Sequence, residues 1–290
     1  MNSSRTEYRA RVDAVIMHMQ DHMGEEINLE ELARVAGFSP FHFHRIFTSL
    51  TGETPQQYLM RMRLEMAANM LVKYFGYSVT RIAAQCGFSS PSTFARAFKA
   101  HFGISAKTYR EADEKPVPQG VKSPVFSREE LPELKIETRS VPDWNLAYVS
   151  NLNGYNLELI CKAWNQLQHW AVSEGLLTSE TRALGISFDD PLITAPEKCR
   201  YYACLTIPEG VVPRPPIGYM KLAGSKCLIA RVSCLPQQIQ PVYMYLYRDW
   251  LVDSGFQPDN IPPYEVYLNP LEANPDARIE MDIYIPIVPL

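Results

Sequence analysis

LEELARVAGFSPFHFHRIFTSLTGETPQQYL, residues 29–59, recurs roughly fifty residues later as VTRIAAQCGFSSPSTFARAFKAHFGISAKTYR, residues 79–110. A helix, a tight glycine turn and a second helix that ends near another glycine make the helix-turn-helix pattern, and it occurs here twice. One additional residue in the second turn changes the offset from 50 to 51 residues. The matched positions are Gly37 with Gly87, Phe38 with Phe88, Phe43 with Phe94, Phe47 with Phe98, Gly52 with Gly103 and Tyr58 with Tyr109.

The second helix of each copy has one apolar face and one polar or basic face. Phe43, Ile46, Phe47 and Leu50, like Phe94, Ala97, Phe98 and Phe102, follow the spacing of a buried helical stripe. The other face centres on one arginine per copy, which can pair with guanine in the major groove, while lysine and hydroxyl groups can hold phosphates or base edges. The candidate DNA-binding residues are Phe41, His44, Arg45 and Thr48 in the first copy, and Ser92, Thr93, Arg96 and Lys99 in the second.

Charge separates the two parts of the chain. Residues 34–110 carry ten Lys or Arg and only two acids, a net charge of +8, whereas residues 116–290 carry 14 basic and 20 acidic side chains, a net charge of −6. A merely solvated helix face is the alternative interpretation of either copy taken alone. Matched arginines in a basic segment favour double-stranded DNA as the partner.

Metal and cysteine chemistry explain little of this chain. His42 and His44 stand two residues apart, and such residues on a helix point about 200° away from each other, so they cannot hold one ion. The six cysteines include no C-x-x-C pair and no zinc-ribbon spacing, and we expect reduced, mostly buried thiols. The sequence therefore predicts no metal site and no cofactor.

Residues 8–112 resemble the DNA-binding domain of the AraC/XylS transcription-factor family, whose signature residues 82–110 match almost throughout. The resemblance implies seven helices, with PQQYLMRMRLEMAANMLVK, residues 55–73, as a rod joining two subdomains. It also implies two recognition helices in successive major-groove segments, roughly 34 Å apart. The second copy departs from the pattern in its short side chains and Pro91, so a larger share of shape or phosphate contacts is expected there.

The segment EKPVPQGVKSP, residues 114–124, with three prolines and a glycine, predicts a linker over 114–130 between domains at 1–113 and 131–290. The second domain contains its own repeat, strand, helix, strand, strand, once from WNLAYVSNLNGY and once from KCLIARVSCLPQ. The predicted fold class is multidomain: an all-α tandem helix-turn-helix domain, then a duplicated α+β domain with its helices on one sheet face.

An acidic and aromatic groove is predicted on the sheet face away from these helices. Aligning the two units at Pro191 and Pro270 pairs Glu265 with Ile186. A carboxylate among aromatic rings suits a lipophilic cation, and an exposed edge with ordinary charges is the alternative. Strand alternation predicts Tyr264, Val266 and Leu268 toward the helices, and Glu265, Tyr267, Glu280, Asp282 and Tyr284 toward the groove.

Residues 131–290 resemble the GyrI-like effector-binding domain, also found in the Rob regulator and in multidrug-sensing regulators. The proline-introduced first strand, the doubled unit and PPYEVYLNP, residues 262–270, carry the resemblance. In ligand-binding members the equivalent glutamate lies in the binding cavity and meets cationic or aromatic compounds, which implies that role for Glu265. Candidate wall residues by location are Tyr148, Trp164, Trp250, Tyr267 and Tyr284, with core packing as the alternative for the two tryptophans.

Two classes of function remain. One is a sequence-specific, ligand-responsive transcriptional regulator with DNA, a small cationic or aromatic effector and RNA polymerase as partners. The other is a GyrI-like small-molecule hydrolase or drug-sequestering protein fused to a DNA-binding module. The chain has no G-x-S-x-G or H-E-x-x-H motif and no Cys–His nucleophile pattern, so no enzyme is predicted. The charged N-terminus and the lack of a long apolar run predict a cytoplasmic protein without a membrane segment.

Overall fold

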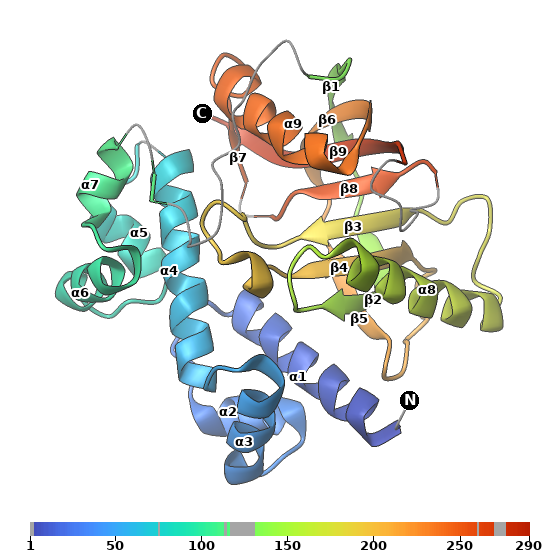
Figure 1. The fold of residues 1–290 in the computed structure, drawn as a ribbon, viewed down its shortest axis with the longest axis horizontal. Helices are drawn as coiled ribbons and strands as arrows, with labels where there is room; N and C mark the ends of the chain where they lie inside the picture. Colours follow the sequence, from blue (N-terminus) through green and yellow to red (C-terminus); the bar gives the residue numbers. More distant parts are fainter. Residues whose placement is uncertain (1–2, 75, 113–114, 117–130, 260, 270–276) are drawn as a thin grey trace. The chain divides into compact units, whose positions relative to one another are not determined.

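The computed structural model describes residues 3–74, 76–112, 115–116, 131–259, 261–269 and 277–290. The chain divides into two compact units, Met1–Pro118 and Gln119–Leu290, the first helical and the second built around a sheet (Figure 1). Most of the predicted linker, residues 114–130, lies outside the described residues.

The described part of the first unit holds the seven helices that the resemblance implies. Each predicted helix-turn-helix copy is a pair of consecutive helices, α2 with α3 and α5 with α6, and the long α4 joins the two copies. The helices are α1 (Ser3–Asp21), α2 (Leu29–Ala36), α3 (Pro40–Thr51), α4 (Pro55–Lys73), α5 (Val79–Gln85), α6 (Pro91–Phe102) and α7 (Ala106–Glu111).

The two copies use the same local chemistry and the same core. In each copy a glycine in the left-handed region, Gly37 (φ +67°) or Gly87 (φ +76°), turns the chain after the first helix. Phe47 of α3 packs edge-on against Tyr58, with ring centroids 5.4 Å apart, and Phe98 of α6 packs in the same way against Tyr109 at 5.5 Å. The repeat in the sequence is therefore a repeat of packing.

The described residues of the second unit form a nine-stranded antiparallel sheet that carries two main helices. Its strands run in the order β1-β6-β9-β8-β3-β4-β2-β5, and β7 pairs with β9. The strands are β1 (Lys135–Val141), β2 (Trp144–Asn151), β3 (Ala183–Ser187), β4 (Tyr201–Thr206), β5 (Gly218–Leu222), β6 (Ser225–Cys234), β7 (Phe256–Pro258), β8 (Tyr264–Tyr267) and β9 (Ile279–Pro289). The helical elements are α8 (Leu157–Ser173), α9 (Ile239–Tyr245), the short η2 (Pro196–Lys198) and η3 (Pro236–Gln238), and the π-helical turn η4 (Leu246–Trp250).

The predicted duplication is present, and the two repeats exchange their outer strands. One repeat is β2-α8-β3-β4 and the other is β6-α9-β8-β9, and they meet where β3 pairs with β8. The strand before each repeat crosses to the other one, because β1 pairs with β6 and β5 pairs with β2. Where the chain crosses, the Gly224 N–H donates to Asp143 Oδ1 at 2.8 Å.

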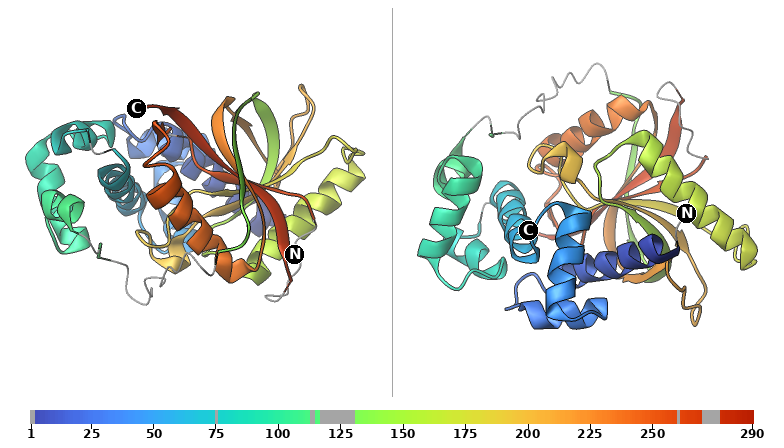
Figure 2. Two further views of the ribbon diagram at one scale, coloured as in Figure 1. Left: turned by 90° about the horizontal axis from the view of Figure 1, so that it is seen from above. Right: turned by 60° about the horizontal axis from the view of Figure 1, so that its bottom comes forward.

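Both main helices cover the same face of the sheet, as predicted (Figure 1). Trp164 and Leu167 of α8 join a core cluster with residues of β2 and β4, while Val242 and Leu246 join another with β6 and β9. The strands are visibly twisted and curved in the two views of Figure 2. This arrangement gives the unit two sheet faces of different character, one under the helices and one opposite them.

Candidate functional site

Helix α3, the second helix of the first copy, presents the predicted first set of DNA-binding residues to solvent. Phe41 is 66% exposed, and His44 and Arg45 are also exposed. The Arg45 guanidinium carbon lies 5.5 Å from the centroid of the Phe41 ring, a cation–π distance that restricts where the arginine points. Thr48 differs from the others because it is half-buried and its hydroxyl donates to the His44 carbonyl at 2.8 Å.

The equivalent helix α6 also exposes its predicted residues, but its hydroxyl groups bond to one another. Ser90 Oγ lies 3.1 Å from Ser92 Oγ and 2.9 Å from Thr93 Oγ1, and it caps the helix by accepting the Thr93 N–H. Arg96 and Lys99 are exposed one and two turns further along the helix. The polar reach of α6 therefore rests mainly on these two cationic side chains.

Glu265 on β8 is a buried carboxylate under the helices of the second unit, with 4% of its surface exposed. The Tyr243 hydroxyl, from α9, donates to Glu265 Oε1 at 2.5 Å. Oε2 is buried and has no hydrogen-bond partner among the described residues. Burial raises the pKa of Glu265 to about 7, and the Tyr243 hydrogen bond only partly offsets this effect. One oxygen is therefore left for a further partner, in a group that changes charge near neutral pH.

A second set of aromatic groups lies beside this carboxylate under the helices. The indole N–H of Trp164 donates to the Tyr201 hydroxyl at 3.0 Å, and that hydroxyl lies 3.0 Å from the Tyr267 hydroxyl. A Cβ at Gly185 would stand 2.5 and 2.6 Å from the hydroxyls of Tyr201 and Tyr267, so the strand leaves room for this pair only because it has glycine there. Trp164 is thus in the core, as the packing alternative proposed, and also donates to a buried tyrosine pair.

The prediction that Glu265 faces away from the helices was wrong, because Tyr243 of α9 bonds to it. Glu265 and Tyr267 pair with Ile283 and Met281 of β9, and both of those partners belong to the core cluster under α9. The prediction failed because both faces of this sheet are buried. Tyr264 and Val266, predicted toward the helices, lie on the opposite face and are as buried as Glu265, so alternation could not tell the faces apart. Leu268, predicted with them, is 49% exposed.

The sheet curves, and aromatic rings from strands that are not adjacent meet on the face opposite the helices. Trp144 of β2 lies 5.8 Å from Tyr264 and 6.2 Å from Tyr284, although two strands, β3 and β4, separate β2 from β8. In a flat sheet these strands would be about 14 Å apart. Tyr284 stacks on Tyr264 at 4.9 Å, and Tyr148 stacks on Tyr202 at 4.9 Å.

The predicted wall residues therefore do not form one site. Tyr267 and Trp164 lie on the helix side with Glu265, whereas Tyr284 and Tyr148 lie on the opposite face with Tyr264 and Tyr202. Glu280 and Asp282, also predicted in the groove with Glu265, lie across the sheet from it, and Asp282 binds Arg231 at 2.7 Å. Sequence reasoning missed Tyr243 and Tyr201. The tyrosines at alternate positions 243, 245 and 247 were the available signal for the former.

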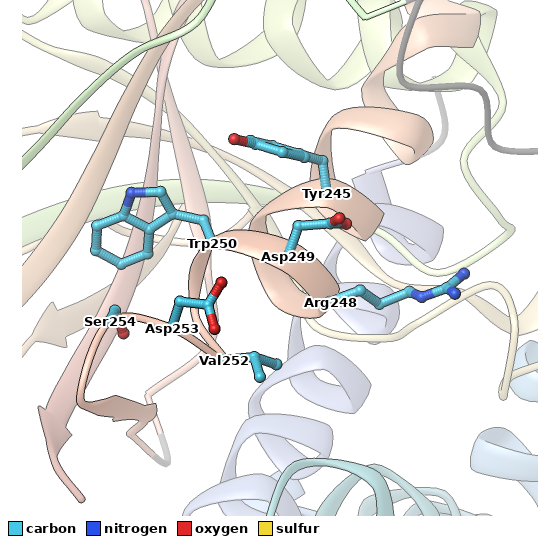
Figure 3. Close-up of a pocket in the computed structure, with 7 residues that line it drawn as sticks. All are labelled: Tyr245, Arg248, Asp249, Trp250, Val252, Asp253 and Ser254. Carbon is cyan, nitrogen blue, oxygen red and sulfur yellow. The ribbon is translucent and has the colours of Figure 1, made fainter.

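Trp250 packs against the core cluster under α9, as its packing alternative proposed, and also lines an open hollow at the end of the second helical segment. Its ring and the Arg248 side chain extend in different directions from the π-helical turn η4 (Figure 3). Glu265 is not one of the residues that line this hollow. They are Tyr245, Arg248, Asp249, Trp250, Val252, Asp253 and Ser254.

In the described part of the chain, no group of three or more His, Cys, Asp or Glu side chains has a geometry suited to a metal ion. Likewise, none of the helices described is long and apolar enough to cross a membrane.

Comparison with protein families matches both units. A model described as a helix-turn-helix domain matches residues 32–112, and a model of the GyrI-like small molecule binding domain matches residues 134–288, more than half of the chain. The chain belongs to the GyrI-like family. Ahead of its GyrI-like domain stands a helix-turn-helix domain of AraC type.

Individual relatives cover one unit at a time. The HTH-type transcriptional activator RhaS of Escherichia coli O139:H28 is 35% identical over 102 residues, 35% of this chain and 36% of RhaS. The crystal structure of the AdpA DNA-binding domain with target DNA is 35% identical and covers 34% of this chain and 89% of that chain, with a TM-score of 0.33. The EcmrR C-terminal domain is 13% identical and covers 54% of this chain and 99% of that chain, with a TM-score of 0.43. The chain spans about a third of the length of RhaS.

Proposed function

We propose that this protein is a sequence-specific DNA-binding transcriptional regulator whose GyrI-like domain binds a small cationic or aromatic effector at Glu265. The observation that carries the first half is the repeated recognition helix, which exposes Arg45 on α3 and Arg96 on α6 above equivalent aromatic cores. RNA polymerase is the further proposed partner, because a regulator bound at a promoter acts on transcription through it. RhaS, similar over this region, is named a transcriptional activator.

Replacing Arg45 or Arg96 by alanine is expected to weaken binding to the selected DNA site by about 1–3 kcal/mol and to relax base preference at one position. The site would be obtained by selection from random DNA, and affinity measured by anisotropy titration. Arg34 on α2 is also exposed, so Arg34→Ala removes the same charge away from the recognition helices. It should lower the salt dependence without changing base preference. If base preference were unchanged in both recognition-helix variants, neither Arg45 nor Arg96 would contact a base.

The proposal that an effector binds at Glu265 rests on the unpartnered Oε2 of this residue. A buried carboxylate oxygen beside the half-buried rings of Tyr243 and Tyr267 offers a cation both charge pairing and aromatic contact. Catalysis is the less favoured function, because the described side chain that bonds to Glu265 is a tyrosine rather than a nucleophile and base pair.

Glu265→Gln is expected to reduce the affinity for a lipophilic cationic dye about tenfold or more, while an uncharged dye of similar shape loses little. The loss should be largest above pH 7, where the wild-type carboxylate is ionised. Glu280→Gln is the matched control, because Glu280 is exposed and lies on the opposite sheet face. Equal dye affinity in Glu265→Gln and wild type at pH 8 would rule out the charge pairing.

A further inference from the structure

The loop ahead of the first helix-turn-helix copy touches the second copy directly, in addition to the connection through α4. The loop between α1 and α2 lies against the turn between α5 and α6. A Cβ at Gly24 in that loop would stand 3.0 Å from the Gln85 carbonyl oxygen, and a Cβ at Gly87 would stand 2.6 Å from the Met23 carbonyl oxygen. Backbone therefore meets backbone at this contact, with glycine on each side.

Arg63 of α4 fixes the contact in place. Its Nε–H donates to the Met23 carbonyl at 3.0 Å, and its Nη2–H donates to the Glu25 carbonyl. The same guanidinium lies against the second copy, because a Cβ at Gly87 would stand 2.7 Å from its Cζ and Nη2 atoms. In the described part of the chain Arg63 forms no ion pair, so its fixed fork of donors is used on backbone carbonyls. We call Arg63 with these two carbonyls the Arg63 clamp.

The first copy shows what the same position looks like without this contact. Gly37, the repeat equivalent of Gly87, has a similar φ of +67°, but a Cβ there would meet only Arg11 Nη1, at 3.3 Å. Arg11 Nη1, on α1, donates to the Gly37 carbonyl at 3.4 Å, and both residues lie ahead of α4 in the chain. The turn geometry is therefore common to both copies, whereas the crowding around Gly87 comes from the α1–α2 loop and Arg63.

We infer that the Arg63 clamp is a positioning device that holds the two recognition helices at one fixed spacing and rotation, and so makes the protein selective for the spacing of its two DNA elements. The inference rests on the proposed DNA-binding function. A helix rod alone can bend, and α4 would then let α3 and α6 adjust independently to the DNA. A backbone-to-backbone contact locked by two hydrogen bonds to a planar guanidinium removes that freedom.

Spacing is a sensitive readout because DNA is a helix. Each inserted base pair moves one element about 3.4 Å along the axis and turns it about 35° around it. A rigid pair of recognition helices can follow this change only by releasing one of them. We therefore expect the wild-type protein to lose roughly tenfold or more in affinity for the selected site when one base pair is inserted between its two elements.

The test compares Arg63→Met, which keeps much of the side-chain bulk, with wild type on the original site and on sites with one base pair inserted or removed. The variant should bind the original site less tightly and lose at least threefold less than wild type on the altered sites. Arg63→Lys keeps the charge but lacks the fork, and should also tolerate the altered sites better than wild type. Arg11→Met is the control, because among the described residues Arg11 bonds only to groups ahead of α4, the Gly37 carbonyl and Glu7, and its loss of affinity on the altered sites should equal that of wild type.

If a folded Arg63→Met or Arg63→Lys variant lost as much affinity as wild type when one base pair is inserted or removed, the proposed role of the Arg63 clamp would be wrong. Circular dichroism of both variants establishes that they are folded, and if Arg63→Met fails to fold, the comparison rests on Arg63→Lys. A wild-type protein that selects no DNA sequence would contradict the proposed function itself. A wild-type protein that selects a site but tolerates the altered spacing would contradict the clamp alone.

Discussion

Gly224→Ala should destabilise the C-terminal unit by about 3 kcal/mol, a large fraction of what holds a domain of this size together. A Cβ at this position would stand 2.6 Å from the Val141 carbonyl oxygen and 2.8 Å from backbone atoms of Pro142 and Asp143. These are backbone atoms at the point where the exchanged strands cross, and they cannot move aside as the end of a side chain can. The bond from the Gly224 N–H to Asp143 would be strained or lost as well.

The unfolding of this unit can be followed separately. All four tryptophans, Trp144, Trp164, Trp170 and Trp250, belong to it, so tryptophan fluorescence in urea reports its stability in the full chain. Gly175→Ala is the control, because Gly175 has a positive φ of +67° but nothing within 4 Å of a Cβ. That substitution should cost about 1 kcal/mol from backbone strain alone. If Gly224→Ala cost no more than Gly175→Ala, the crossing would be far less tightly packed than the structure indicates.

The strand exchange at this crossing was beyond the reach of sequence reasoning, although the repeats were not. The glycine and aromatic positions of the first unit predicted both helix-turn-helix copies, and the same aromatic pairs appear in both cores. In the second unit the order of strands and helices predicted the duplicated repeat. The partner of β1 and β5 depends on contacts between distant segments, which local patterns do not encode.

The sequence predicted Glu265 as a residue of the candidate site, but it did not predict the sheet face of Glu265 or its hydrogen-bond partner. Glu265 was found because the aligned repeat has isoleucine at the equivalent position, 186, but its face was assigned from alternation, which is informative only when one face is exposed. Here the opposite face is closed by Tyr264, Tyr284 and Trp144. Tyr243 comes from a helix more than twenty residues away in sequence, and the three tyrosines at 243, 245 and 247 do not show which of them reaches Glu265.

The pH dependence of stability offers the second large effect, and it depends on this same carboxylate. Burial raises the pKa of Glu265 from its ordinary 4.5 to about 7, so the folded chain binds this proton more tightly than the unfolded chain. The stability that the neutral form provides is present below pH 4.5 and is lost as the pH rises through 7. The free energy of unfolding should therefore fall by about 3 kcal/mol across this window from Glu265 alone, and level off above it.

Glu265→Gln isolates that contribution, because glutamine keeps an acceptor for the Tyr243 hydroxyl and does not titrate. The difference in unfolding free energy between variant and wild type, measured by tryptophan fluorescence in urea from pH 4 to pH 8.5, cancels the other carboxylates. It should shift in favour of the variant by about 3 kcal/mol between the two ends of the range. A flat difference for Glu265→Gln would mean that this carboxylate is already solvated or paired with a cation in the folded protein.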